Sequence, residues 1–174
     1  MLECGPNLTS SRRSGCVLDI SGFHWTPRAC FYEDLSMEAM LSYNIAGEKG
    51  TDNSIQRQFD WYEDSNMTRR LETLSDIKTY LEKQAEKSGK IVAVTHLSWH
   101  ATHCMYISRI GTLAIEKLAR GEKNVYVPDM SIRPHHMEHC ESMVYDVLWS
   151  AQHSALMNRI YEVEFSFTRC VKLA

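Results

Sequence analysis

The second half of the chain has the clearest hydrophobic pattern. Between residues 71 and 85 apolar side chains recur at the spacing of one helix face, and Ser88-Gly89 ends the run. Residues 91–94 form a continuous apolar run, which is typical of a strand covered on both faces. A second helical pattern begins with Ser98 as a cap and ends at Gly121. Gly111 lies inside this pattern and is a poor helix former, which leaves room for a kink or break there.

The pattern continues to the end of the chain. Residues 125–127 predict a short strand, and Ser131 and Pro134 open a further helix that runs to about residue 155. Residues 161–168 alternate strictly between apolar and polar, which predicts a strand with Val163, Phe165 and Phe167 toward the core and one wet face. The last 85 or so residues therefore follow the order β-α-β-α-β.

The first half of the chain is less regular and richer in strands. Residues 1–15 lack an apolar period, so we expect a flexible arm. Residues 17–25, 30–34 and 37–45 predict strands, although 37–41 suits a helix equally well. Residues 46–54 predict a loop, and 55–70 give no assignment. The fold class that follows is α/β or α+β, as a single domain over residues 16–174 with a mixed sheet.

Composition narrows the classes of function. The chain has 174 residues with 44% hydrophobic and 24% charged residues and a net charge of −3, which argues against nucleic acid as its main partner. No apolar run is long enough to cross a bilayer. The N-terminus lacks the pattern of a signal peptide, so we expect an intracellular, cytoplasmic protein whose six cysteines are thiols.

One short pattern occurs twice and consists of residue types that can bind a metal. It is His-x-x-His-Cys, at residues 100–104 and again at 136–140. Positions i, i+3 and i+4 share a helix face, and imidazole and thiolate are the ligands that zinc prefers. If the two helices run side by side with their first turns together, they form a closed, structural zinc site. The predicted ligands are His100, Cys104, His136 and Cys140, with His103 and His139 as alternates.

The same side chains also suit a plain helix-packing role. Cys104 and Cys140 lie on the apolar stripes of their helices, and a free cysteine is among the most buried residue types. His100 and His136 share those stripes and would then be core histidines bonded to the backbone. Metal analysis distinguishes the two interpretations.

Two further triplets point to a different chemistry. His24-Trp25-Thr26 and His96-Leu97-Ser98 each end a strand-like run. This arrangement is similar to that of the 2H phosphoesterases, in which two such triplets on facing strands cleave cyclic or 2′,5′-linked phosphates. The resemblance implies that His24 and His96 act as general base and acid, while Thr26 and Ser98 hold the phosphate. The resemblance is limited to these two triplets, and the rest of the chain does not match the family.

Other catalytic motifs are absent from the sequence, including G-x-S-x-G, the P-loop and H-E-x-x-H. Nine methionines suit an adaptable contact surface. Our leading hypothesis is a non-enzymatic interaction or assembly protein, structural or accessory, that binds a protein partner or itself as a homo-oligomer. The phosphoesterase is the alternative.

Overall fold

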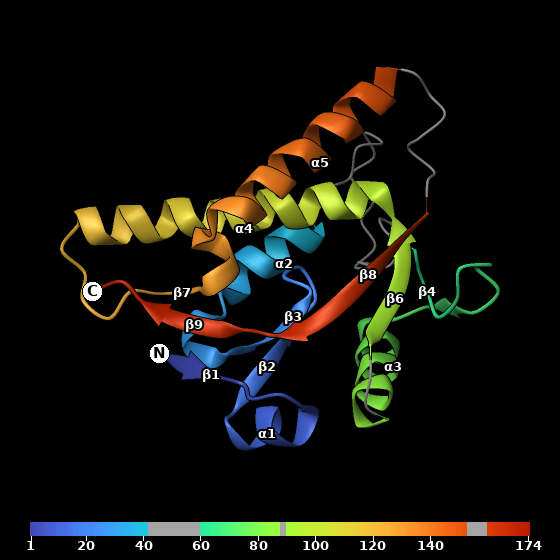
Figure 1. The fold of residues 1–174 in the computed structure, drawn as a ribbon, viewed down its shortest axis with the longest axis horizontal. Helices are drawn as coiled ribbons and strands as arrows, with labels where there is room; N and C mark the ends of the chain where they lie inside the picture. The colour runs from blue at the N-terminus through green and yellow to red at the C-terminus, as the bar shows by residue number, and fades with distance from the viewer. Residues whose placement is uncertain (42–59, 88–89, 153–159) are drawn as a thin grey trace.

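The computed structural model describes residues 1–41, 60–87, 90–152 and 160–174. Its strands form two sheets, as Figure 1 shows. The larger sheet has the order β2-β3-β8-β6-β4-β5, made of Cys16–Asp19, His24–Pro27, Ile160–Phe167, Ile91–His96, Trp61–Tyr62 and Arg70–Leu71. It is mixed, because β3 and β8 run parallel while the other neighbouring strands run antiparallel. The smaller antiparallel sheet has the order β1-β9-β7, made of Leu2–Glu3, Arg169–Lys172 and Tyr126–Pro128.

Helices pack around these strands. Among the described residues they are α1 to α5, at Leu8–Arg13, Glu33–Leu41, Leu74–Glu86, Leu97–Ala119 and Pro134–Gln152, with short 3-10 turns η1 at Arg28–Cys30 and η3 at Asp129–Ile132. In the view of Figure 1, α1 and α3 lie below the strands, and α2, α4 and α5 lie above them. The mixed α/β class predicted from the sequence is confirmed.

The strand β8 confirms the alternation read from residues 161–168. Val163 and Phe165 are buried and pair with Ala93 and Ile91 of β6, while Glu164 on the opposite face is exposed. Phe167 is only half-buried, because it lies at the end of the strand and stacks on Trp25. A period of two along β8 therefore places one row of side chains in the core.

The helices predicted in the second half are present, with small differences. The helix α3 begins at a capping box made by Thr73 and Asp76, which satisfies the backbone N–H groups of the first turn. The helix α4 begins one residue before Ser98 and continues through Gly111 without a break. Burial along one side of α4 outweighs the modest helix-forming penalty of a single glycine.

Several predictions in the first half are wrong. Residues 30–34 were expected as a strand, but they form η1 and the start of α2. For residues 37–41 strand and helix were both open, and the structure shows the helix α2. Glu33 and Asp34 lie in the first turn of α2, where acidic side chains favour the helix N-terminus. Residues 42–45 and the predicted loop at 46–54 lie outside the described residues.

The order β-α-β-α-β is present along the chain, but its strands do not share one sheet. The middle strand β7 pairs with β9 in the smaller sheet, and β6 pairs with β8 antiparallel. The strand β9 has no counterpart in the sequence prediction, because its four residues are too short for a period to show.

The N-terminal segment expected as a flexible arm is folded. Asn7 caps α1 through a capping box with Ser10, and β1 pairs with β9. A disulfide joins Cys4 to Cys16, and a second joins Cys30 to Cys170. The prediction of six thiols is therefore wrong, since four cysteines are paired and only Cys104 and Cys140 are free.

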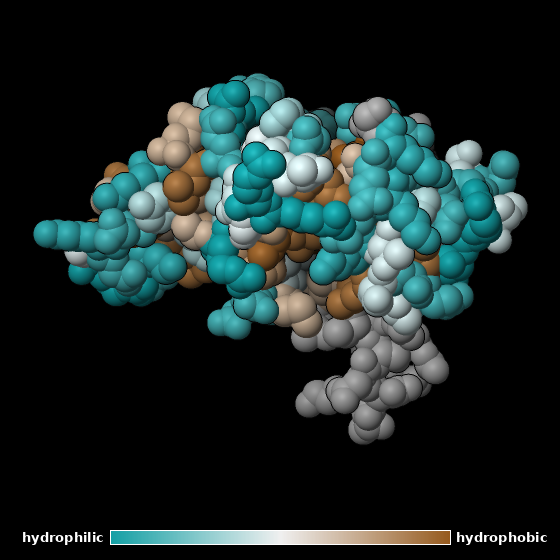
Figure 2. Space-filling view, turned by 90° about the horizontal axis from the view of Figure 1, so that it is seen from below, coloured by the Kyte–Doolittle hydropathy of each residue, from teal (hydrophilic) through white to brown (hydrophobic). Residues whose placement is uncertain are grey.

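Two clusters of buried side chains make up the core. The larger one lies against the six-stranded sheet and includes Trp25, Leu81 and Phe165. The smaller one packs α4 against α2 and β7 through Tyr106, Ile110 and Val127. Figure 2 shows that the face seen from below is mostly hydrophilic, with apolar residues visible between polar ones. Within the described residues, no helix is both long and apolar enough to cross a membrane.

Candidate metal centre

The two His-x-x-His-Cys segments meet where α4 and α5 cross. Strand β6 leads directly into α4, and η3 leads into Pro134 at the start of α5, so both segments lie in the first turns of their helices. His100 lies against His139, with 3.2 Å between their Nε2 atoms, and the rings of His103 and His136 have centroids 5.7 Å apart. The earlier residue of one segment thus meets the later residue of the other. Figure 1 shows that α4 and α5 run in opposite directions where they cross, so they do not lie side by side with their first turns together as the sequence analysis supposed.

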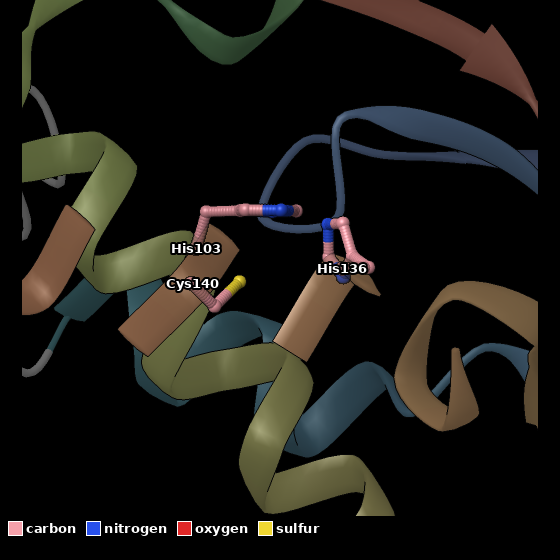
Figure 3. Close-up of side chains that lie close together, drawn as sticks. All are labelled: His103, His136 and Cys140. Atoms are coloured by element: carbon pink, nitrogen blue, oxygen red, sulfur yellow. The ribbon is translucent and has the colours of Figure 1, made fainter. Parts of the chain in front are cut away.

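Three side chains at this crossing could hold a metal ion. His103 from α4 and His136 and Cys140 from α5 have ligand atoms that all lie within 4.8 Å of one another. Figure 3 shows them pointing toward a common space, with the turn between β2 and β3 passing beside them. Cys140 and His136 share one face of α5, because they are four residues apart.

Backbone carbonyl groups fix the orientation of both imidazole rings. The oxygen of Ser21 lies 2.9 Å from Nδ1 of His103, and the oxygen of Met130 lies 3.1 Å from Nδ1 of His136. A carbonyl oxygen can only accept a hydrogen bond, so each neutral ring carries its proton on Nδ1. Nε2 is then the atom of each ring that offers a lone pair to a metal, which is the usual arrangement around metal-bound histidines.

Both rings are kept neutral by their surroundings. Burial lowers the pKa of His103 well below its ordinary value and lowers the pKa of His136, against the opposing effect of the backbone hydrogen bonds. Burial also lowers the pKa of the neighbouring His100 to about 4, and His139 and His136 act in the same direction. Neutral imidazole is the form that binds metal, so near neutral pH the site is ready for an ion without losing a ring proton.

The thiols of Cys104 and Cys140 are buried and share a hydrogen bond across the crossing. That bond lowers the pKa of Cys140, which accepts, whereas the bond and burial together raise the pKa of Cys104, which donates. The thiolate is the form of cysteine that binds a metal, so Cys140 is the better ligand of the two. Both cysteines line a groove of about 510 Å³ between α4 and α5, whose outer rim includes Glu138 and Glu141.

The sequence analysis predicted the right segments but not the right combination. Of its four first-choice ligands, His136 and Cys140 belong to the group, and the alternate His103 joins them. His100 and the alternate His139 instead contact each other, and Cys104 shares a hydrogen bond with Cys140. Spacing within each helix shows which residues share a face, but the direction of the crossing decides which residues meet.

The structure does not bring the two His-x-Ser/Thr triplets together. His24 and Thr26 are fully buried in β3, and His96 ends β6. Along β8, His24 pairs with Ser166 and His96 with Ile160, six positions away. At about 3.3 Å per residue the two histidines are roughly 20 Å apart, too far to act on one phosphate.

The residues that the sequence analysis missed are in the turn between β2 and β3. Ser21 orients His103, and the ring of Phe23 stacks on the ring of His103 with centroids 4.1 Å apart. Phe23 adopts a positive φ of 57°, which is uncommon for a bulky side chain and which the sequence gives no sign of.

Comparison with known proteins gives no relative: no family model, no curated protein and no solved structure matches the chain. The chemistry of the α4–α5 crossing is therefore the basis for assigning a function.

Proposed function

We propose that the protein is a zinc-binding domain in which the ion fastens α5 to α4. Its ligands are Nε2 of His103, Nε2 of His136 and Sγ of Cys140. The observation that carries this proposal is the convergence of the three ligand atoms within 4.8 Å, with the carbonyls of Ser21 and Met130 occupying Nδ1 of both rings and leaving Nε2 for the metal. Core histidines also bond to the backbone, so the feature that favours a metal is the thiol of Cys140, whose ligand atom lies within 4.8 Å of those of both rings.

The ligand set favours zinc among the common divalent ions. Imidazole nitrogen and thiolate sulfur are soft or borderline donors, whereas magnesium and calcium take oxygen ligands. One thiolate and two neutral imidazoles leave a partly compensated positive charge, which suits a site enclosed by protein. Tetrahedral zinc needs four ligands, and the group supplies three of them.

The two disulfides point to a cellular compartment other than the cytoplasm, and a bound ion would protect the free thiols there. Disulfides persist in oxidising compartments and are rare in the cytosol, so we propose such a compartment in place of the cytoplasm. Two neighbouring thiols in that environment would tend to oxidise. A bound ion protects Cys140 by holding it as a metal thiolate, and it thereby keeps Cys104 without a partner for disulfide formation.

With the ion in place, α5 becomes a fixed surface for a protein partner or a second copy of the chain. Tyr145 and Trp149 on this helix are 63% and 55% exposed, and their rings stack with centroids 6.3 Å apart. Exposed aromatic pairs of this kind are enriched in protein interfaces. This continues our leading hypothesis of a binding or assembly protein.

The test compares two neighbouring thiols. Protein purified without a histidine tag should contain about one zinc per chain by elemental analysis, and a chelator should lower its melting temperature. Cys140→Ser should lose the metal, whereas the matched variant Cys104→Ser should keep it. Cobalt should bind in place of zinc and show a thiolate charge-transfer band that Cys140→Ser abolishes. Less than about 0.2 zinc per chain with no chelator effect would refute the proposal.

The binding role has its own measurement. Sedimentation velocity over a range of protein concentrations detects a homo-oligomer, and the double variant Tyr145→Ala/Trp149→Ala should weaken it without releasing zinc. If the wild-type chain stays monomeric at all concentrations, self-association is excluded and a different protein partner is the remaining form of the hypothesis.

A further inference from the structure

The groove between α4 and α5 is lined mainly by apolar and sulfur-containing side chains. It has a volume of about 510 Å³, and its lining includes Cys104 and Met105 from α4 and Met137, Cys140 and Val144 from α5. Methionine is flexible and its sulfur is polarizable, so a surface of this kind adapts to apolar side chains of different shapes. The groove therefore offers a place where an apolar segment of another molecule can bury its surface.

The walls of the groove decide which backbone conformation fits it. Both walls are helices, and beyond the first turn their backbone groups are hydrogen-bonded within each helix, so no strand edge is available to an extended peptide. A segment that lies in the groove must then satisfy its own backbone groups, as a helix does. The lining residues of α5 run from Pro134 to Val144, which at about 1.5 Å per residue is roughly 15 Å, or nearly three helical turns.

Two carboxylates without a basic partner lie at the rim of the groove. Glu138 and Glu141 both line it, and both side chains are exposed. Neither forms an ion pair with any residue that the structure describes, whereas Glu82 and Glu86 on α3 both bond to Arg12. Lysine or arginine side chains beside the apolar ones of a partner would supply the complementary charge.

The acidic rim continues into the exposed aromatic pair of α5. Glu141, Tyr145 and Trp149 are four residues apart and so share one face of the helix. The rings of Tyr145 and Trp149 are exposed and stacked. Because the face of a tyrosine or tryptophan ring attracts lysine and arginine, this extension of the surface also favours a basic partner.

We propose that the groove binds an amphipathic helix of another protein, with its apolar side chains in the groove and its lysines or arginines against Glu138, Glu141 and the aromatic pair. This inference rests on the proposed role of α5 as a binding surface, and it names the chemistry of the partner. The zinc ion, by fastening α5 to α4, fixes the distance between the two walls. A second copy of this chain is a poorer occupant, because its net charge of −3 opposes an acidic rim.

Fluorescence anisotropy with synthetic peptides tests the chemistry of the partner. The probe is a fluorescein-labelled peptide of about 15 residues, with leucine along one helix face and lysine on the others. One comparison peptide has glutamate in place of lysine, and another has the same residues in an order without an apolar face. The zinc-loaded wild type should bind the probe at least about tenfold more tightly than either comparison peptide. Equal binding of all three peptides, or binding of none, would overturn the proposal.

Two exposed apolar residues of α4 provide matched variants. Met105 lines the groove, whereas Ile115 is exposed on the same helix and does not line it. Met105→Lys should raise the Kd for the probe at least about tenfold, because it places a like charge and a polar group against the bound helix. Ile115→Lys, with the same change of charge, should leave the Kd unchanged. A Met105→Lys variant that binds the probe as the wild type does would refute the proposal.

Reversing the charge of the rim tests the basic part of the partner. Glu138→Lys/Glu141→Lys should bind the glutamate peptide more tightly than the lysine probe. The control is Glu82→Lys/Glu86→Lys on α3, which lies on the other side of the strands in Figure 1 and should keep the preference of the wild type. If the Glu138→Lys/Glu141→Lys variant also keeps that preference, the rim does not select the partner and the proposal is wrong.

Two measurements on the same samples separate this inference from the proposed zinc site. Elemental analysis gives the zinc content: failure to bind the probe with zinc in place overturns the role of the groove alone, and binding of the probe by a chain without zinc overturns the metal site alone. Sedimentation velocity gives the oligomeric state. Self-association that Met105→Lys abolishes would mean that a second copy occupies the groove, and it would overturn the proposal of a basic partner.

Discussion

Acidifying the metal-free protein from about pH 7 to about pH 5 tests the buried histidines at the helix crossing. His100 is the group for which the effect can be worked out, because its pKa is lowered from 6.5 to about 4 by burial and by the nearby His139 and His136. In the unfolded chain the same ring takes up a proton near pH 6.5. Between these two values the unfolded state binds more protons than the folded state, so stability falls as the pH falls.

The size of this effect follows from the two pKa values. Each unit of difference is worth about 1.4 kcal/mol once the pH lies below both, and at about pH 5 His100 alone removes roughly 2 kcal/mol of the free energy of unfolding. His24, His103 and His136 are shifted in the same direction, so the wild-type protein should lose more than this in total.

Urea unfolding in the presence of a chelator measures it. The loss of stability between the two pH values should be about 2 kcal/mol smaller for His100→Gln than for the wild type. The control is His135→Gln, because His135 is exposed in the folded protein and meets water in both states. If His100→Gln and the wild type lose the same free energy on acidification, the ring is not held neutral by its surroundings and the reasoning fails.

Two further predictions concern the fold itself. Phe165 is buried against three aromatic rings, so Phe165→Ala should cost about 3–5 kcal/mol in urea unfolding, and a loss below about 1 kcal/mol would place β8 outside the core. The disulfide Cys30–Cys170 spans 140 residues and Cys4–Cys16 spans 12, so chain entropy predicts losses of about 5 and about 3 kcal/mol when each pair is replaced by alanine. Equal melting temperatures for the two double variants would contradict that order.

The sequence predicts elements well where burial has a regular period. The alternation in β8 and the stripe in α3 are of this kind, since each row of apolar side chains faces one continuous core. It predicts poorly where a short segment gains its structure from distant partners. The N-terminal residues looked unstructured because their order comes from pairing with β9 and from the disulfide between Cys4 and Cys16.

The candidate metal site also has a part that the sequence predicts and a part that it does not. That His-x-x-His-Cys places its ligands on one helix face is a local property, so both segments could be found from the sequence. The choice of His103 over His100 depends on the direction in which α5 crosses α4, and the role of Ser21 depends on a turn more than 80 residues away in the chain. Neither leaves a periodic signal.

This distance along the chain bears on how the metal would act. The groups that fix the site come from the β2–β3 turn, from α4, and from the η3–α5 segment, so an isolated peptide with one His-x-x-His-Cys segment lacks most of them. Preorganised ligands bind metal more tightly than ligands that the ion must gather, and the difference in binding energy appears as stability of the folded state. Zinc affinity and resistance to unfolding should therefore change together in any variant that loosens the helix crossing, even one that leaves all ligands in place.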